Sequence, residues 1–231
     1  MIIQRKSEDR GFADYGWLKT HHSFSFDTYY DANFMGFGAL RVINQDIVAG
    51  GGGFLMHGHR NMEIVTYIIR GALEHKDSLG NTSVIRPGEA QRMSAGKGIR
   101  HSEFNHSKTE EVELLQIWIL PQEQELDPSY EQKSFTEIQK QNEPVLLAGP
   151  KDSRACVQIH QQAKIFAVKG DINFSQNTQI RPEEKIWIQL ISGQLTVNGV
   201  QIGPGDAVGL MGEKNLEIKA NSDFHCLMFH V

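Results

Sequence analysis

Two short pairs of metal-capable side chains constrain this chain more than any other feature. His57 and His59 are separated by one residue, and so are His101 and Glu103. In a β-strand, residues i and i+2 point to the same face, so each pair presents two ligands side by side. Three imidazoles and one carboxylate suit a divalent first-row metal. The sequence therefore predicts a metal site inside a sheet that closes on itself.

The residues around the two pairs also have a characteristic spacing. The first pair lies between Gly51 and Glu63, with Gly71 beyond them, and the second lies between Gly88 and Asn105. Both stretches resemble the two sequence motifs of the cupins, which are β-barrel proteins that hold a metal between such strands. A His-x-His pair combined with a His-x-Glu pair resembles the pirin family, a group of two-cupin proteins.

An internal repeat supports two barrels in one chain. Residues 68–71 match residues 190–193, and residues 86–90 match residues 203–207. Duplication of one structural unit explains both matches. We therefore expect an all-β bicupin, with two jelly-roll barrels joined by a short helical linker.

The expected domain boundaries follow the composition. Residues 1–120 form a metal-binding cupin barrel, residues 121–144 form a linker rich in Gln, Glu and Pro, and residues 145–231 form a second cupin barrel. Within the linker, Ser134 and Glu137 have the spacing of a capping box, which predicts one short helix.

The second barrel is expected to lack metal ligands. Counting back from Gly193, by the spacing that separates Gly71 from the first histidine pair, leads to Gln179 and Arg181. The equivalent of Glu63 is then Lys185. An arginine and a lysine would repel a dication.

Composition excludes several partners. The formal net charge is -5, without a run rich in Lys or Arg, which argues against direct binding to nucleic acid. No apolar run approaches the ~20 residues needed to cross a bilayer, and the first ten residues do not resemble a signal peptide. We expect a cytoplasmic protein. Cys156 and Cys226 have no paired spacing, so buried, reduced thiols are expected.

Two carboxylates, Glu63 and Glu103, are candidates for the fourth metal ligand. Glu63 lies four residues after His59, so on an unbroken strand it shares the histidine face and either binds the metal or orients a ligand. The resemblance to pirins favours Glu103. Asn105 shares the face of Glu103, whereas His75 and His106 are expected at the surface.

The resemblance to bacterial pirins implies a quercetin 2,3-dioxygenase, which opens the central ring of a flavonol with O2 and releases carbon monoxide. It makes iron the first choice of metal, although the ligands also suit zinc, cobalt, nickel, manganese and copper. Glu103 would accept the substrate proton. The candidates for an apolar mouth are Phe34, Phe54, Met56 and Met93.

Two other functions fit the same ligands. One is a metal-containing redox sensor or regulatory protein that binds a protein partner, because the animal pirin is a transcription coregulator. The other is a metal-dependent isomerase. A barrel fold by itself does not decide between them.

Overall fold

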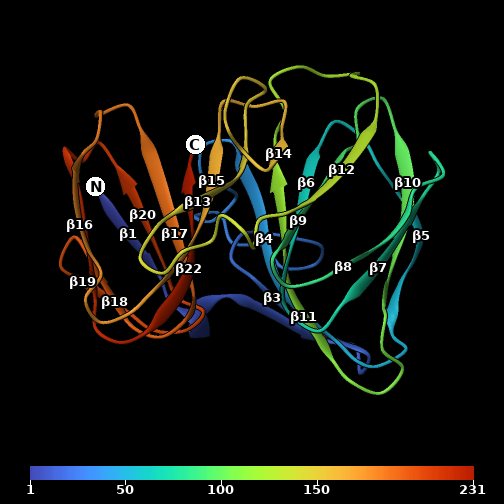
Figure 1. Ribbon diagram of the computed structural model, residues 1–231, viewed down its shortest axis with the longest axis horizontal. Coiled ribbons are helices and arrows are strands. Elements are labelled where there is room, and N and C mark those ends of the chain that lie inside the picture. Colours follow the sequence, from blue (N-terminus) through green and yellow to red (C-terminus); the bar gives the residue numbers. More distant parts are fainter. The chain divides into compact units, whose positions relative to one another are not determined.

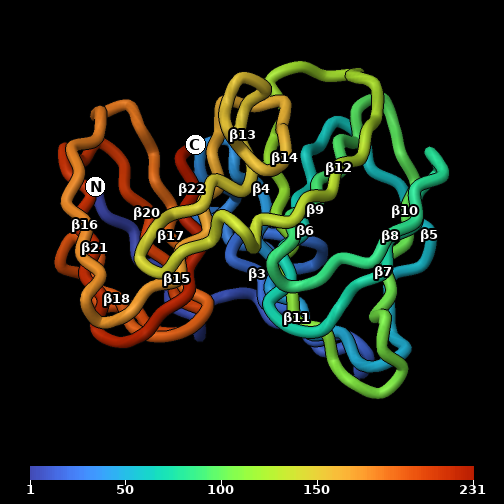
Figure 2. Tube along the Cα trace, viewed as in Figure 1, coloured from blue at the N-terminus to red at the C-terminus, as the bar shows by residue number.

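The computed structural model describes all 231 residues, and strands form nearly all of its regular structure. A single three-residue 3-10 helix, η1 (Ser7–Asp9), is the exception. No helix in the structure has the length and apolar character needed to span a membrane. The chain forms two compact units, traced in Figure 1 and Figure 2: a histidine unit (Gly11–Thr136 and Ala148–Gln162) and a C-terminal unit (Met1–Arg10, Glu137–Leu147 and Ala163–Val231).

The histidine unit contains two antiparallel sheets. The larger has the order β12-β9-β6-β11-β4-β3-β2 and comprises β2 (Gly11–Asp14), β3 (Leu18–His22), β4 (Leu40–Val48), β6 (Glu63–Arg70), β9 (Glu89–Ser94), β11 (Val112–Ile119) and β12 (Ser129–Ser134). The smaller has the order β5-β10-β7-β8 and comprises β5 (Gly53–His59), β7 (Leu73–Asp77), β8 (Thr82–Ile85) and β10 (Ile99–Asn105).

The C-terminal unit has the same plan. Its larger sheet has the order β1-β20-β17-β22-β15-β13 within the unit and comprises β1 (Ile2–Arg5), β13 (Val145–Gly149), β15 (Lys164–Gly170), β17 (Lys185–Ser192), β20 (Ala207–Met211) and β22 (Phe224–His230). Its smaller sheet has the order β16-β21-β18-β19 and comprises β16 (Ser175–Gln179), β18 (Leu195–Val197), β19 (Val200–Ile202) and β21 (Asn215–Ala220). Strand β13 continues into the histidine unit, where Ala148 pairs in parallel with β14 (Val157–Gln158).

The central strands explain why the chain folds into sheets. β6 and β11 are rich in β-branched and other apolar residues, and most of their residues are buried. A strand covered on both faces needs such a continuous apolar run rather than alternation. β10 instead alternates, with Ile99, His101, Glu103 and Asn105 buried. Its inward face therefore carries the second predicted ligand pair.

The repeated segments occupy equivalent places in the two units. Gly71 ends β6 with φ of 78°, and Gly193 ends β17 with φ of 85°. A Cβ atom on Gly71 would lie 2.8 Å from the Glu111 carbonyl oxygen, and one on Gly193 would lie 2.1 Å from the Asp223 carbonyl oxygen. Only glycine fits both the left-handed conformation and this close approach, which explains why the two segments share it.

The predicted linker helix is absent. Ser129–Ser134 instead forms β12, which pairs antiparallel with β9 so that Ser134 lies opposite Glu89. The Ser134 hydroxyl accepts a hydrogen bond from the Thr136 amide at 3.3 Å, which closes a turn rather than capping a helix. Residues 136–138, which would follow the Ser134 cap, form a turn, and the segment before the cap pairs with the edge of β9.

The two units also differ from the continuous ranges expected from composition. Met1–Arg10 belongs to the C-terminal unit, because β1 pairs with β20 from Ile2 opposite Leu210 to Arg5 opposite Ala207. Ala148–Gln162 belongs to the histidine unit. These assignments depend on strand pairing between distant segments, which composition does not reveal.

Candidate metal centre

Two neighbouring strands carry the predicted ligand pairs. β5 and β10 are antiparallel, with His101 opposite His57 and Ile99 opposite His59. The register shifts between His101 and Glu103, so that Glu103 lies opposite Phe54. Such an irregularity twists a strand and re-aims the side chains beside it. The first and second ligand pairs therefore meet at one end of the smaller sheet.

The three histidines form one compact group. One ring nitrogen from each of His57, His59 and His101 lies within 4.8 Å of the others. Their ring centroids are separated by 4.8 Å (His57 to His59), 4.4 Å (His57 to His101) and 4.9 Å (His59 to His101). Glu103 lies in a second group with His101 and His75, again within 4.8 Å. The structure thus brings the four predicted residues together around His101.

The donor atoms of this cluster fit a divalent cation. Both ring nitrogens of His101 and Oε1 of Glu103 are buried without a hydrogen-bond partner. Nδ1 of His57 lies 2.7 Å from the Leu55 carbonyl oxygen, so Nδ1 carries the proton and Nε2 offers its lone pair. Buried polar atoms are normally satisfied, and a bound metal would satisfy one His101 nitrogen and the Glu103 oxygen.

Burial keeps the imidazoles of His59 and His101 neutral, as metal ligands must be. Burial, assisted by the neighbouring His57, His59 and His75, lowers the pKa of His101 to about 2. Burial, assisted by His57, lowers the pKa of His59 to about 4. Near neutral pH the ring nitrogens are therefore available as lone-pair donors.

Glu103 is held by a buried chain of hydrogen bonds. Gln116 Nε2 donates to Glu103 Oε2 at 2.8 Å, and Thr66 Oγ1 donates to Gln116 Oε1 at 3.0 Å. Burial raises the pKa of Glu103 to about 7, although the Gln116 hydrogen bond opposes the shift. The carboxyl can therefore hold or release a proton near neutral pH while Gln116 fixes its orientation.

His75 is not at the surface, contrary to the sequence-based expectation. It is fully buried on β7, directly opposite Glu103 of β10. Its Nε2 lies 3.0 Å from Asp77 Oδ2, and the Tyr130 ring stacks on it with centroids 4.7 Å apart. His106, in contrast, is exposed and pairs with Glu74 at 2.7 Å. The difference is decided by the register of β7 against β10, which the sequence does not show.

Glu63 does not join either group of metal-capable residues. The chain turns between β5 and β6, with Asn61 at φ of 50°, so Glu63 lies in the other sheet from His59. Its Oε2 accepts a hydrogen bond from Ser94 Oγ at 2.8 Å, and His160 Nδ1 lies 3.2 Å from its Oε1. The unbroken strand assumed from the spacing does not exist.

Asn105 shares the inward face of β10 as expected but has a different role. Its Nδ2 donates to the carbonyl oxygens of Val48 at 2.9 Å and Glu110 at 2.7 Å. It therefore ties the end of β10 to the neighbouring chain rather than reaching the histidines.

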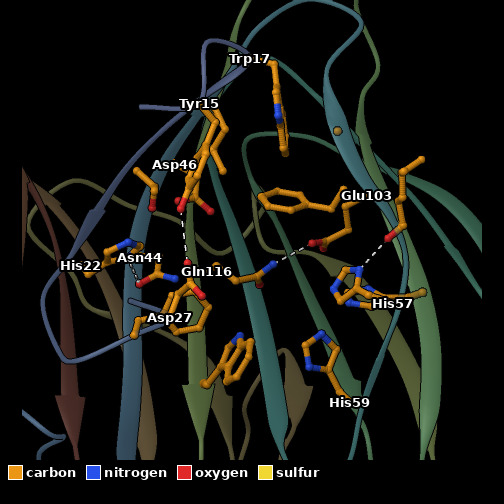
Figure 3. Close-up of a pocket in the computed structure, with 18 residues that line it drawn as sticks. Tyr15, Trp17, His22, Asp27, Asn44, Asp46, His57, His59, Glu103 and Gln116 are labelled. Carbon is orange, nitrogen blue, oxygen red and sulfur yellow. Dashed lines mark hydrogen bonds between the residues drawn. The ribbon is translucent and has the colours of Figure 1, made fainter. Parts of the chain in front are cut away.

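A cavity of about 600 Å³ opens onto the histidines (Figure 3). Of the four apolar candidates, Phe54 lines it, whereas Met93 is buried in a separate core cluster and Phe34 and Met56 are not part of the wall. The aromatic residues that do line it are Tyr15, Trp17, Phe26, Phe54 and Trp118. Most come from strands and loops remote from the histidine motifs, so proximity in sequence could not identify them.

Comparison with known proteins agrees with this architecture. The Pirin family profile matches residues 4–119, and that of the quercetinase C-terminal cupin domain matches residues 146–231. The chain is 43% identical over 229 residues to the quercetin 2,3-dioxygenase of Escherichia coli strain K12, covering 99% of this chain and 98% of the relative. The chain belongs to the pirin family. The expected all-β, two-cupin fold is thereby confirmed.

One further bacterial relative and one solved structure of a bacterial pirin resemble the chain over nearly its whole length. A pirin-like protein of Caulobacter vibrioides is 38% identical to this chain over 224 residues. The match covers 96% of this chain and 96% of that protein. The crystal structure of the bacterial pirin YhhW from Escherichia coli in complex with nickel(II) superposes with a TM-score of 0.95 at 42% identity, covering 100% of this chain and 99% of that one. A divalent metal is thus bound by a pirin of the same fold.

Proposed function

We propose that this protein is a metal-dependent dioxygenase that opens the central ring of a flavonol such as quercetin with O2 and releases carbon monoxide. The observation that carries the proposal is the convergence of His57, His59, His101 and Glu103 at the wall of an aromatic-lined cavity. Relatives named quercetin 2,3-dioxygenase match over nearly the whole chain, which supports the same reaction class here.

The four residues would hold one divalent cation, for which we propose iron. Three imidazoles and a carboxylate leave one or two positions of a five- or six-coordinate metal open, unlike a closed structural site. When bound, the metal would act as a Lewis acid that lowers the pKa of a coordinated hydroxyl and would offer a position for O2. Nickel, zinc, cobalt, manganese and copper suit the same donors.

The chain's own residues would bind the substrate and move its proton. The aromatic walls formed by Trp17, Phe54 and Trp118 would bury a flat, aromatic ligand. Glu103, as the carboxylate beside the flavonol 3-oxygen, would accept the proton of the 3-hydroxyl. Gln116 would hold the carboxylate in place through its 2.8 Å hydrogen bond while this occurs.

The test is aerobic turnover of quercetin by iron-loaded protein, with flavonol absorbance and carbon monoxide followed together. We expect loss of absorbance with one equivalent of carbon monoxide, abolished in a folded His101→Ala variant. The exposed His106→Ala variant is the matched control and should retain turnover.

Absence of both signals in metal-loaded wild type would contradict the dioxygenase assignment for this substrate. Turnover without oxygen consumption would instead favour an isomerase. Partner binding that follows the oxidation state of the metal would favour the regulatory function.

A further inference from the structure

One wall of the cavity carries two buried polar side chains that the proposed reaction does not use. Thr20 of β3 and Asp46 of β4 are direct cross-strand partners, and both line the cavity. Their exposed fractions are 3% and 4%. Figure 3 shows Asp46 on the side of the cavity opposite His57 and His59. These two residues therefore form a small polar area remote from the metal-capable histidines.

The two side chains differ from His22 and Asn44, on the same strands, in having buried atoms without a hydrogen-bond partner. Oδ1 of Asp46 and Oγ1 of Thr20 are buried without a hydrogen-bond partner. Two residues along the same strands, His22 Nδ1 and Asn44 Oδ1 bond each other at 2.8 Å. Buried polar groups left without partners cost free energy, so the free atoms of Thr20 and Asp46 point to a ligand.

The fold itself does not require polar residues here. In the histidine unit, Asp46 pairs across strands with Leu114, and Leu114 pairs with Ile68. In the C-terminal unit, Val168 pairs with Cys226, and Cys226 pairs with Leu190. Ile68 and Leu190 occupy the same place in the repeated segments, so Val168 is the equivalent of Asp46. Val168 is packed in the apolar core of its unit. An apolar residue therefore serves the architecture at this position.

We propose that Thr20 and Asp46 form a hydroxyl-binding subsite that recognises a phenolic hydroxyl on the substrate ring remote from the metal. The inference rests on the proposed function and specifies its substrate class: a flavonol hydroxylated on an outer ring. A phenolic O–H donates to Asp46 Oδ1, and the Thr20 hydroxyl can donate to the same phenolic oxygen.

The charge of the wall agrees with a hydroxyl rather than an anion. Burial raises the pKa of Asp46 to about 6, although the adjacent Thr20 hydroxyl opposes the shift, so its carboxylate is an acceptor above that pH. Glu103 is close enough for the charge of Asp46 to raise its pKa as well. A ligand carboxylate or phosphate would be repelled by both groups. A neutral donor is the chemistry that satisfies them.

The experiment compares two flavonols that differ in outer-ring hydroxyls. Quercetin carries hydroxyls on both outer rings, and 3-hydroxyflavone carries none. Both are titrated into full-length, nickel-loaded protein without oxygen, and the quenching of tryptophan fluorescence, which reports on Trp17 and Trp118 in the cavity wall, gives the dissociation constant without any turnover.

In this titration, Asp46→Val and Thr20→Val remove the polar atoms, and Asp46→Asn keeps one acceptor oxygen. We expect Asp46→Val to weaken quercetin binding about tenfold, the usual effect of losing a hydrogen bond to a charged group, and Thr20→Val to weaken it less. Binding of 3-hydroxyflavone should change less than twofold in every variant, and Asp46→Asn should recover most of the quercetin affinity. Asp152→Asn, at an exposed turn, is the control.

Equal weakening of both flavonols, or unchanged quercetin affinity in folded Asp46→Val and Thr20→Val proteins, would overturn the subsite. Wild-type protein that binds 3-hydroxyflavone but shows no preference for quercetin would also overturn it while leaving the proposed function standing. Wild-type protein that binds neither compound would overturn both.

Discussion

The two units of this protein share a strand plan but have opposite interiors. Strand pairing relates five buried polar residues of the histidine unit to residues of the C-terminal unit: His101 to Leu216, Glu103 to Ile218, His75 to Val197, Gln116 to Met228 and Asp46 to Val168. All five residues of the C-terminal unit belong to one buried apolar cluster. One architecture therefore holds either a polar centre or an ordinary core.

The comparison teaches that the polar centre is maintained by connected hydrogen bonds rather than by the fold. In the histidine unit, Thr66, Gln116 and Glu103 are bonded in series, and His75 is bonded to Asp77. A half-satisfied buried network is less stable than an apolar core. Among the atoms that stay unsatisfied, those on His101 and Glu103 include the ones that a metal would bind.

The largest expected effect comes from converting the metal centre to its apolar equivalent. His101→Leu should weaken binding of nickel(II) by more than about 100-fold. Losing a metal ligand costs more than losing a residue that hydrogen-bonds to a ligand, which lowers affinity by about 10- to 100-fold. Isothermal titration calorimetry measures it, with exposed His106→Leu as the control. Unchanged affinity in a folded variant would remove His101 from the ligand set.

The reverse change should destabilise the C-terminal unit without creating a metal site. Leu216→His buries an imidazole in an apolar cluster, and should lower the free energy of unfolding by about 3 kcal/mol. Urea unfolding measures this loss, with exposed Thr178→His as the reference. Full recovery of stability on adding nickel(II) would show that this unit retains a latent site.

Asp46→Asn should stabilise the metal-free protein in a pH-dependent way. Burial raises the pKa of Asp46 from 3.8 to about 6, so its ionisation in the folded state carries a penalty that is absent below pH 3.8 and complete above pH 6. The variant should therefore gain roughly 3 kcal/mol at pH 8, and little at pH 4. Urea unfolding at both pH values tests it; an equal gain at the two values would contradict the assignment.

The smallest effect is expected from replacing Gln116, the hydrogen-bond partner of the metal ligand Glu103. Gln116→Met introduces the residue found at the equivalent place in the C-terminal unit and removes the 2.8 Å hydrogen bond to Glu103. Nickel(II) affinity should fall about tenfold, as is usual for outer partners of metal ligands. Calorimetry with Gln45→Met, at the half-buried Gln45 that bonds Glu113, provides the comparison. An unchanged affinity would mean that Gln116 does not orient Glu103.

The same comparison corrects the alignment predicted by counting residues. Strand pairing places Thr178 and Ile180 at the positions of His57 and His59, not Gln179 and Arg181. The connection to the following strand is one residue longer in the C-terminal unit, since Ile180 and Lys185 are five apart whereas His59 and Glu63 are four apart. Lys185 does occupy the place of Glu63, at the start of its strand.

Features that depend on local geometry could be predicted from the amino-acid sequence. A two-residue spacing puts His57 beside His59, and His101 beside Glu103, in any β-strand. The glycines at 71 and 193 follow from turns that only glycine fits. The repeat of these turns predicted two similar units.

Only the tertiary structure decided which distant residues join those pairs. Burial of His75 depends on its register against Glu103, and Thr20 and Asp46 meet the cavity because β3 and β4 pair there. Ser129–Ser134 became a strand because β9 offered an open edge. Backbone pairing between remote segments is set by the free energy of the whole sheet, whereas side-chain direction within one strand is set by neighbouring residues alone.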